Sequence, residues 1–417
     1  MKSATALIFS LLYSYAAYIL GEPWFRLFGR RKKVTKINLA QVERVLVIRL
    51  DEIGDVVIST PLLRELRRNL PKARISLLVN SVTYNLVEHC PYVDEILNSG
   101  PVAVGGIHVI KVPIRSLRVA AQRLWSRRFD LAIIPRWDED VHQATFTGYF
   151  SGAPLRLGYS EKVNPRKSWH NKGHDRLLTH AIVDTSVKHE LEHNLDILKF
   201  LGGKVEEAAL ELWDTERDNE FAEKTLREAS VEPGKTLIAF CPGAAALKRT
   251  WPVSGFFELG RWLQKRYNAH IVVIGGPNDR NLGRELYLKI GDGITDVTGR
   301  ATLRQTYSLL KRAHLYVGGD TGPMHMAAAA GIPVIEISCH PKSGVAGSVN
   351  APGRLGPWVA RRIIIQPETP IPPCSAECSA KCPHCITQIT VDELKEAVEK
   401  LFSGETFQLS ELQVDRE

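Results

Sequence analysis

The residues best suited to chemistry are a carboxylate, a hydroxyl and two glycines in one short segment, Gly319-Asp320-Thr321-Gly322. The apolar run before this segment predicts a buried strand, and Pro323 with the residues after it predicts the start of a helix, where proline is tolerated. Backbone N–H groups at a helix start attract phosphate, and Gly322 lets the backbone approach a ligand closely. The segment therefore predicts a phosphate or pyrophosphate site, with an ordinary strand-to-helix turn as the alternative.

A second candidate is Asp55, in the loop Asp51-Glu52-Ile53-Gly54-Asp55 that follows an apolar run at 44–50. Gly54 permits a sharp turn at this point. A carboxylate at the end of a strand could accept the proton of a substrate hydroxyl. The alternative is that Asp55 caps the N-terminus of a helix.

Two further loops offer contacts to a ligand. In residues 242–252, Gly243 and three alanines allow a ligand to come close, while Lys248 and Arg249 supply positive charge that a departing phosphate needs. A solvated basic loop is the alternative. In residues 275–279, a polar side chain such as Asp279 could bind ribose hydroxyls.

Four of the seven cysteines cluster near the C-terminus, with His384 among them: Cys374, Cys378, Cys382 and Cys385. Such a density suits a zinc or iron–sulfur site. The spacing differs from that of a two-pair zinc ribbon, however. We therefore favour reduced thiols in an ordered loop, or a redox-sensitive pair, over a bound metal.

Alternating strands and helices position the loops of the first half. After the strand at 44–50, leucines recur at helical spacing over 62–70, and a strand follows at 75–79. Three arginines lie on the opposite face of this helix: Arg64, Arg67 and Arg68. Further strands are predicted at 109–112 and 131–134, and the polar residues 160–190 predict a long loop.

A second set of alternations begins near residue 235. It predicts strands at 237–240, 271–274, 315–317 and 334–337, and helices at 256–267, 302–312 and 391–402. Both halves thus predict α/β folds with doubly wound parallel sheets, whose functional loops lie at the carboxyl ends of strands. We assign residues 38–215 and 216–390 to two domains, and 391–417 to a final helix and tail.

The N-terminus combines an uncharged, apolar segment at 3–21 with a basic cluster at 30–33. This order predicts that residues 1–37 lie on or span a membrane, leaving the remainder in the cytoplasm. A helix packed on the protein and a signal-like segment are the alternatives. The net charge of +8 suits an anionic membrane surface or phosphorylated substrates. No nucleic-acid-binding module is apparent in the sequence, so we expect no nucleic acid partner.

Three segments, in this order, resemble glycosyltransferase family 9, the ADP-heptose:lipopolysaccharide heptosyltransferases. They are residues 47–61 around Asp55, Pro242-Gly243 with Lys248-Arg249-x-Trp251-Pro252, and Gly319-Asp320-Thr321-Gly322-x-x-His325. The resemblance runs from about residue 44 to 395. It implies a GT-B fold, in which two Rossmann-like domains face a cleft and close on substrate. It also implies an inverting, metal-independent transfer of a sugar from a nucleotide diphosphate, with no cofactor required.

The resemblance also implies roles for individual residues. Asp55 matches the family's proposed general base, and Arg249 or Lys248 matches the basic residue that steadies the departing diphosphate. Binding of the donor, ADP-heptose or another nucleotide-diphosphate sugar, would fall to Gly54, Gly243, Asp279, Asp320, Thr321, Gly322 and His325. The acceptor would be lipopolysaccharide core with its lipid A, contacted by Arg64, Arg67 and Arg68, at the inner face of the cytoplasmic membrane.

Three other functions fit parts of this pattern. A member of the same family could use another nucleotide sugar or another glycan acceptor. A membrane-tethered protein could bind a nucleotide without catalysis, although Asp55 argues against this. The cysteine cluster could also belong to a metal-dependent redox protein.

Overall fold

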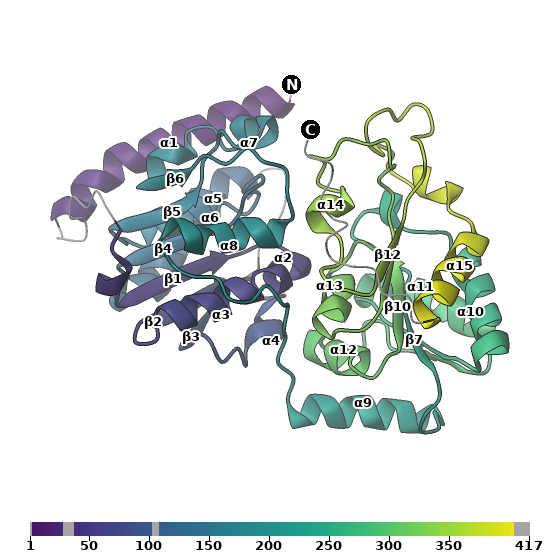
Figure 1. The fold of residues 1–417 in the computed structure, drawn as a ribbon. Helices are drawn as coiled ribbons and strands as arrows, with labels where there is room; N and C mark the ends of the chain where they lie inside the picture. Colours follow the sequence, from purple (N-terminus) through teal and green to yellow (C-terminus); the bar gives the residue numbers. More distant parts are fainter. Residues whose placement is uncertain (1, 28–36, 102–107, 404–417) are drawn as a thin grey trace. The chain divides into compact units, whose positions relative to one another are not determined.

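The computed structural model describes residues 2–27, 37–101 and 108–403 (Figure 1). The chain divides into two compact units, residues 1–208 and 209–417, each built on a six-stranded parallel sheet. The division lies seven residues before the predicted domain boundary at 215/216.

The sheet of the first unit has the strand order β3-β2-β1-β4-β5-β6, with all neighbours parallel. Its strands are β1 (Arg44–Arg49), β2 (Arg74–Val79), β3 (Glu95–Asn98), β4 (Leu131–Ile134), β5 (Leu155–Tyr159) and β6 (His180–Ile182). The central strands are buried on both faces, which explains their continuous apolar sequences. The order reverses between β1 and β4, and α/β sheets bind ligands at such a switch point.

Helices flank this sheet: α2 (Ile53–Ile58), α3 (Thr60–Asn69), α4 (Tyr84–Val87), α5 (His108–Val119), α6 (Ala144–Phe150), α7 (Pro165–His170) and α8 (Glu190–Phe200). Two predictions were wrong here. The predicted strand at 109–112 lies in α5, because a short apolar run does not by itself distinguish a strand from a helix. The predicted loop at 160–190 contains α7, a 3₁₀ turn (His174–Leu177) and β6.

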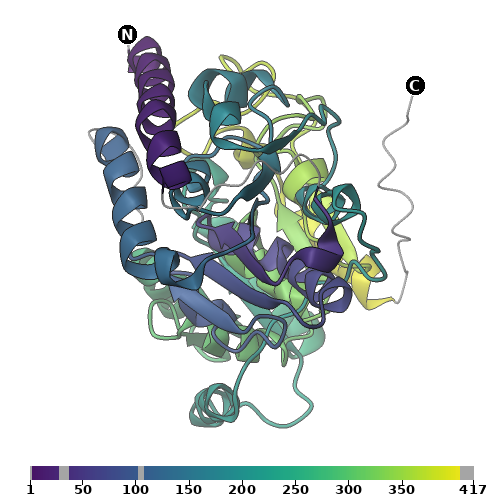
Figure 2. The same cartoon turned by 90° about the vertical axis from the view of Figure 1, so that its left-hand side faces the viewer.

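The N-terminal helix α1 (Lys2–Leu27) packs on the first unit, where it lies beside α5 (Figure 2). Phe25 is buried in the core and meets the ring of Tyr149 edge-on, 5.8 Å between centroids. The helix also exposes large apolar residues: Leu12, Tyr15, Tyr18, Ile19, Leu20, Trp24 and Leu27. Among the described residues, none of the helices combines the length and the apolar character needed to cross a membrane.

The second unit repeats the sheet topology, with the order β12-β11-β10-β7-β8-β9. Its strands are β7 (Leu237–Cys241), β8 (His270–Val273), β9 (Ile294–Asp296), β10 (Leu315–Gly319), β11 (Val334–Ile337) and β12 (Arg362–Ile365). All of these pairs are parallel, and the order reverses between β7 and β10. The second unit therefore has its own switch point, immediately before the loops around Arg249 and Asp320.

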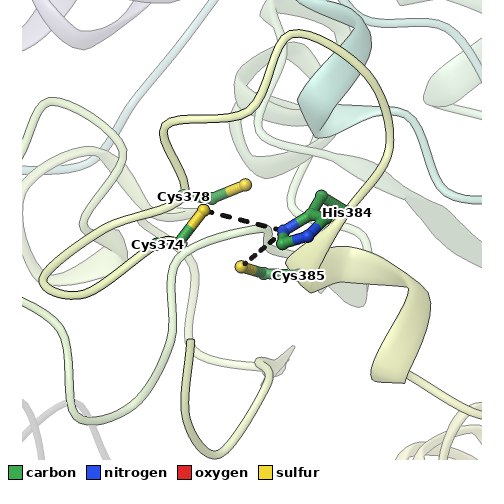
Figure 3. Close-up of side chains that lie close together, drawn as sticks. All are labelled: Cys374, Cys378, His384 and Cys385. Atoms are coloured by element: carbon green, nitrogen blue, oxygen red, sulfur yellow. Dashed lines mark hydrogen bonds between the residues drawn. The ribbon is translucent and has the colours of Figure 1, made fainter. Parts of the chain in front are cut away.

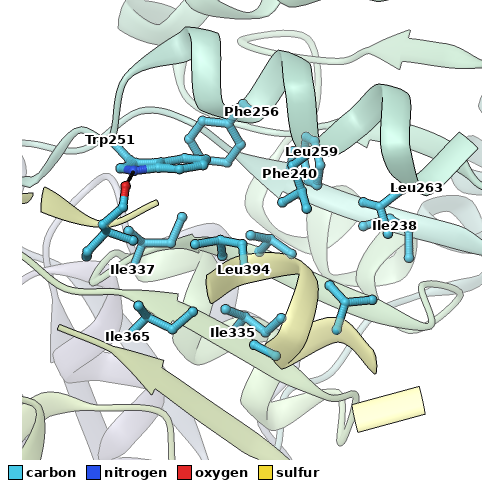
Figure 4. Close-up of a cluster of buried hydrophobic side chains, with 14 of the residues drawn as sticks. Ile238, Phe240, Trp251, Phe256, Leu259, Leu263, Ile335, Ile337, Ile365 and Leu394 are labelled. Carbon is cyan, nitrogen blue, oxygen red and sulfur yellow. Dashed lines mark hydrogen bonds between the residues drawn. The ribbon is translucent and has the colours of Figure 1, made fainter. Parts of the chain in front are cut away.

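Seven α-helices surround this sheet in the described part of the second unit: α9 (Glu216–Glu228), α10 (Val253–Tyr267), α11 (Arg280–Ile290), α12 (Leu303–Leu310), α13 (Gly322–Ala329), α14 (Pro352–Leu355) and α15 (Val391–Phe402). Figure 4 shows the core between α10, α15 and the sheet. Trp251 is buried there, and its Nε1 donates a hydrogen bond to the carbonyl oxygen of Ile389 at 3.0 Å. This contact ties the loop after β7 to the segment before α15.

Candidate functional site

In the first unit, Asp55 lies in a charged cluster at the β1/β4 switch point. It occupies the first turn of α2, where its Oδ2 accepts the backbone N–H of Glu52 at 3.3 Å. Its Oδ1 accepts a hydrogen bond from Arg136 Nη1 at 2.6 Å and lies 3.4 Å from Arg49 Nη2. Arg49 ends β1 and Arg136 follows β4, so the switch point itself brings both cations to this carboxylate.

Two more carboxylates balance these arginines. Asp51 Oδ2 lies 3.5 Å from Arg49 Nη1, and Glu190 Oε1 lies 3.7 Å from Arg49 Nη2. Burial raises the pKa of Asp51, although Arg49 and Arg136 oppose this rise. Burial alone would lower the pKa of Arg136, but Asp55 and Asp51 hold it well above its usual value. The cluster therefore keeps Arg136 charged beside Asp55.

The buried side chain of Lys167, in α7, contacts the backbone of this cluster. Its Nζ donates hydrogen bonds to the carbonyl oxygens of Arg136 and Trp137, at 2.7 and 3.1 Å. Burial lowers the pKa of Lys167 to about 8. Sequence reasoning did not single out Arg136, and it treated Lys167 only as part of a basic loop at 162–176. The position of Arg136 just after a predicted strand was the signal that could have identified it.

In the second unit, the structure brings Arg249 and Asp320 together at the β7/β10 switch point. Arg249 Nη1 lies 3.1 Å from Asp320 Oδ2 and 3.3 Å from the carbonyl oxygen of Asp320. His325, in α13, is buried with its Nε2 at 3.9 Å from Asp320 Oδ1. Thr321 is the N-cap residue of α13, and its Oγ1 lies 3.2 Å from the Tyr316 hydroxyl. A cation and a helix N-terminus thus share one edge of the sheet.

Asp279 lies next to the loop after β7. Its carboxylate accepts the backbone N–H of Gly276 at 2.7 Å. A Cβ atom at Gly243 would lie 1.9 Å from Asp279 Oδ1, so any other residue there would force the Asp279 carboxylate to move. The predicted ribose contact and the predicted close-approach glycine are therefore direct neighbours.

The other predicted residues have different surroundings. Lys248 Nζ donates to the carbonyl oxygen of Cys378 at 2.6 Å, which leaves Arg249 as the basic residue paired with Asp320. Gly54 lies within α2 and Gly322 opens α13. Both glycines therefore belong to helices, and the sharp turn predicted at Gly54 is the first turn of a helix.

The three arginines proposed to contact the acceptor form ion pairs within the first unit. Arg64 is buried and pairs with Glu65 and Glu207, and Arg68 pairs with Glu65 at 2.6 Å. Arg67 pairs with Asp94 at 2.6 Å and donates to the carbonyl oxygen of Ala73, just before β2 begins. All three arginines are therefore held by contacts within the first unit, and the contacts of Arg67 lie just before β2 and β3 begin, at the edge of the sheet opposite Asp55.

Sequence reasoning also missed Glu336, which is buried on β11. Burial, together with the nearby carboxylate of Asp320, raises the pKa of Glu336 well above its usual value, and Arg249 opposes the rise. Its position inside an apolar run, Val334–Ile337, gave no functional signal.

The fold and these two clusters define an enzyme of the GT-B class, with two Rossmann-like units that each carry charged loops at a switch point. Residues 118–383 match the profile described as glycosyltransferase family 9 (heptosyltransferase). The chain belongs to this family, as the three sequence segments indicated, and is a glycosyltransferase.

Individual relatives are distant. The chain is 25% identical over 308 residues to lipopolysaccharide heptosyltransferase 2 of Salmonella typhimurium, covering 70% of this chain and 82% of the relative. A glycosyltransferase family 9 structure from Veillonella parvula has a TM-score of 0.70 and 19% identity over 88% of this chain and 99% of its own. The structure of E. coli ADP-heptose lipopolysaccharide heptosyltransferase II has a TM-score of 0.64 and 19% identity. The match covers 86% of this chain and 98% of the E. coli chain. These structures confirm the fold.

Proposed function

We propose that this enzyme transfers a heptose from ADP-heptose to a hydroxyl group of the lipopolysaccharide inner core, with inversion and without a catalytic metal. The observation that carries the proposal is the pairing of Arg249 with Asp320 at the β7/β10 switch point. The names of the relatives support the choice of substrates, since they include a lipopolysaccharide heptosyltransferase and an ADP-heptose heptosyltransferase.

The second unit would bind the donor. Breaking the bond between the sugar and the diphosphate develops negative charge on the phosphate oxygens. The Arg249 guanidinium and the N-terminus of α13 would stabilise this charge, more strongly in the transition state than in the ground state. Asp320 holds Arg249 in place through the 3.1 Å contact. Asp279, beside Gly243, is the proposed ribose contact.

The first unit would bind the acceptor, with Asp55 taking the proton of the attacking hydroxyl. Arg136 and Arg49 fix the carboxylate of Asp55 through Oδ1, and the Glu52 N–H orients Oδ2. Carboxylate and attacking hydroxyl would then meet in one defined geometry, which is how an enzyme lowers the entropic cost of a proton transfer.

We also propose that α1 holds the enzyme on the inner face of the cytoplasmic membrane. Its outward side exposes Leu12, Ile19 and Leu20, while Phe25 anchors the helix in the first unit. An apolar helix face with an adjacent basic sequence binds anionic bilayers through burial of apolar area and charge attraction. The helix would therefore lie on the membrane surface, close to a lipid-linked acceptor.

Calorimetry with the purified full chain tests the donor assignment. We expect ADP-heptose to bind more tightly than ADP-glucose, UDP-glucose or GDP-mannose, and Asp320→Ala to weaken this binding. Asp292→Ala removes an exposed carboxylate elsewhere in the second unit and should bind like the wild type. Tighter binding of another nucleotide sugar would assign a different donor within the family. Absence of binding to all four would contradict the donor site itself.

A further inference from the structure

Three cysteines and a histidine converge in the segment between β12 and α15. Cys374, Cys378, His384 and Cys385 each offer one ligand atom, and these atoms all lie within 4.8 Å of one another (Figure 3). The three cysteines are buried and carry free thiols. The sequence pattern had suggested Cys382 as a fourth member, but Cys382 is exposed and the imidazole of His384 takes that place.

The spacing of these atoms fits a tetrahedral metal site. Cys374 Sγ and Cys385 Sγ lie 3.6 and 3.5 Å from Nδ1 of His384. Tetrahedral zinc, with bonds of about 2.3 Å to sulfur and about 2.0 Å to nitrogen, separates sulfur and nitrogen ligands by about 3.6 Å. A disulfide would instead need two sulfur atoms about 2.0 Å apart.

The segment around these ligands contains little regular secondary structure. Within residues 366–390, all of which the structure describes, the only regular element is a 3₁₀ turn at Cys385–Gln388. The three buried cysteines are nevertheless part of the core of the second unit. Structural zinc sites commonly order loops of this kind, because the binding free energy contributes directly to folding.

We propose that Cys374, Cys378, Cys385 and His384 bind one Zn²⁺ ion, with each thiol releasing its proton to solvent as the zinc–sulfur bond forms. Four protein ligands leave no open position, so the ion would be structural and would take no part in sugar transfer. Cys378 accepts a hydrogen bond from Lys248 Nζ through its carbonyl oxygen at 2.6 Å. The zinc loop therefore fixes the residue next to Arg249 and supports the loop after β7.

Elemental analysis of the full chain, purified under reducing conditions with Zn²⁺ supplied, tests this site. We expect about one zinc ion per chain, lost in Cys374→Ser and Cys385→Ser. Cys382→Ser is the matched control, since it removes an exposed thiol from the same loop, and it should retain the metal. Co²⁺ in place of zinc should give thiolate charge-transfer bands and the intense visible bands of a tetrahedral site.

A second measurement covers variants that fail to fold. Chelation of the wild-type chain should lower its thermal unfolding midpoint, and added Zn²⁺ should restore it. Wild-type chain without stoichiometric zinc and without cobalt bands would overturn the proposal. Equal metal loss in Cys382→Ser, the absorption of an iron–sulfur cluster, or a disulfide between these cysteines found by mass spectrometry would overturn it as well.

Discussion

At the scale of single residues, each switch point pairs a carboxylate with an arginine. Asp55 meets Arg136 at 2.6 Å in the first unit, and Asp320 meets Arg249 at 3.1 Å in the second. The carboxylates and Arg249 could be found from the sequence because they follow apolar strands in the same loops as glycine. Lys167 and Glu336 could not, because their importance arises from contacts with residues distant in sequence.

Asp55→Asn tests the proposed proton acceptor. Because the amide cannot accept the proton, kcat should fall by about 10²- to 10⁴-fold, while calorimetric binding of ADP-heptose stays unchanged. Glu52→Gln, an exposed neighbour in the same loop, should keep most of its activity. Full activity in a folded Asp55→Asn variant would contradict the assignment.

His174 predicts a pH dependence of stability. Burial lowers the pKa of His174 to about 4. The carboxylate of Asp140, whose Oδ2 lies 3.9 Å from His174 Nδ1, opposes this change. Between about pH 6.5 and pH 4, the imidazole of His174 binds a proton in the unfolded chain but not in the folded chain. The free energy of unfolding should therefore fall as the pH decreases through this window, by roughly 3 kcal/mol from this residue.

Denaturant titrations between pH 4 and 7 measure this dependence. In His174→Gln, the free energy of unfolding should decrease less steeply with falling pH, and the difference in slope should correspond to about one proton. His170→Gln, on the neighbouring helix and partly exposed, should behave as the wild type. A His174→Gln variant with the wild-type pH dependence would refute this explanation.

At the scale of elements, the periodic helices and the apolar inner strands could be predicted, while the strands at the sheet edges could not. The final helix, predicted at 391–402, is Val391–Phe402, and the strand at 334–337 is Val334–Ile337. The four sheet-edge strands β3, β6, β9 and β12 were missed, as was β5 next to an edge, because these segments of three to five residues carry too little apolar pattern. The prediction of the candidate site was not affected by the missed strands, because the site loops follow inner strands of the two sheets.

Gly243→Ala tests how the loop after β7 is built. The added methyl group would overlap the Asp279 carboxylate, so the variant should lose about 1–3 kcal/mol of stability. ADP binding should weaken as Asp279 moves. Gly353→Ala, where an added Cβ meets nothing within 4 Å, is the control and should change neither quantity. Thermal unfolding measures the stability and calorimetry measures ADP binding. A Gly243→Ala variant with wild-type values of both would contradict this geometry.

At the scale of the whole molecule, the two-domain α/β fold could be predicted because both halves alternate strands and helices. The family resemblance gave the GT-B class, and the sheet topologies with the solved family structures confirm it. The packing of α1 could not be derived in the same way. Its sequence is apolar on all sides, and only the structure shows that Phe25 faces the core while Leu20 faces outward.

Leu20→Glu tests the membrane role of α1. Leu20 is 75% exposed, so a glutamate there should fold normally but repel anionic vesicles. Cosedimentation with phosphatidylglycerol vesicles should fall several-fold. Leu288→Glu changes an equally apolar and 69% exposed residue in the second unit and should leave binding intact. Unchanged binding of Leu20→Glu would place the membrane contact elsewhere.

The most direct test of the proposed function is the transfer reaction itself. Purified enzyme would be incubated with ADP-heptose and a heptose-deficient lipopolysaccharide acceptor, with no divalent metal added, and the product mass would be measured. We predict a mass increase of one heptose on the acceptor, with release of ADP, and neither in Asp55→Asn. Transfer of a different sugar only, or release of ADP without any change in acceptor mass, would contradict the proposed reaction.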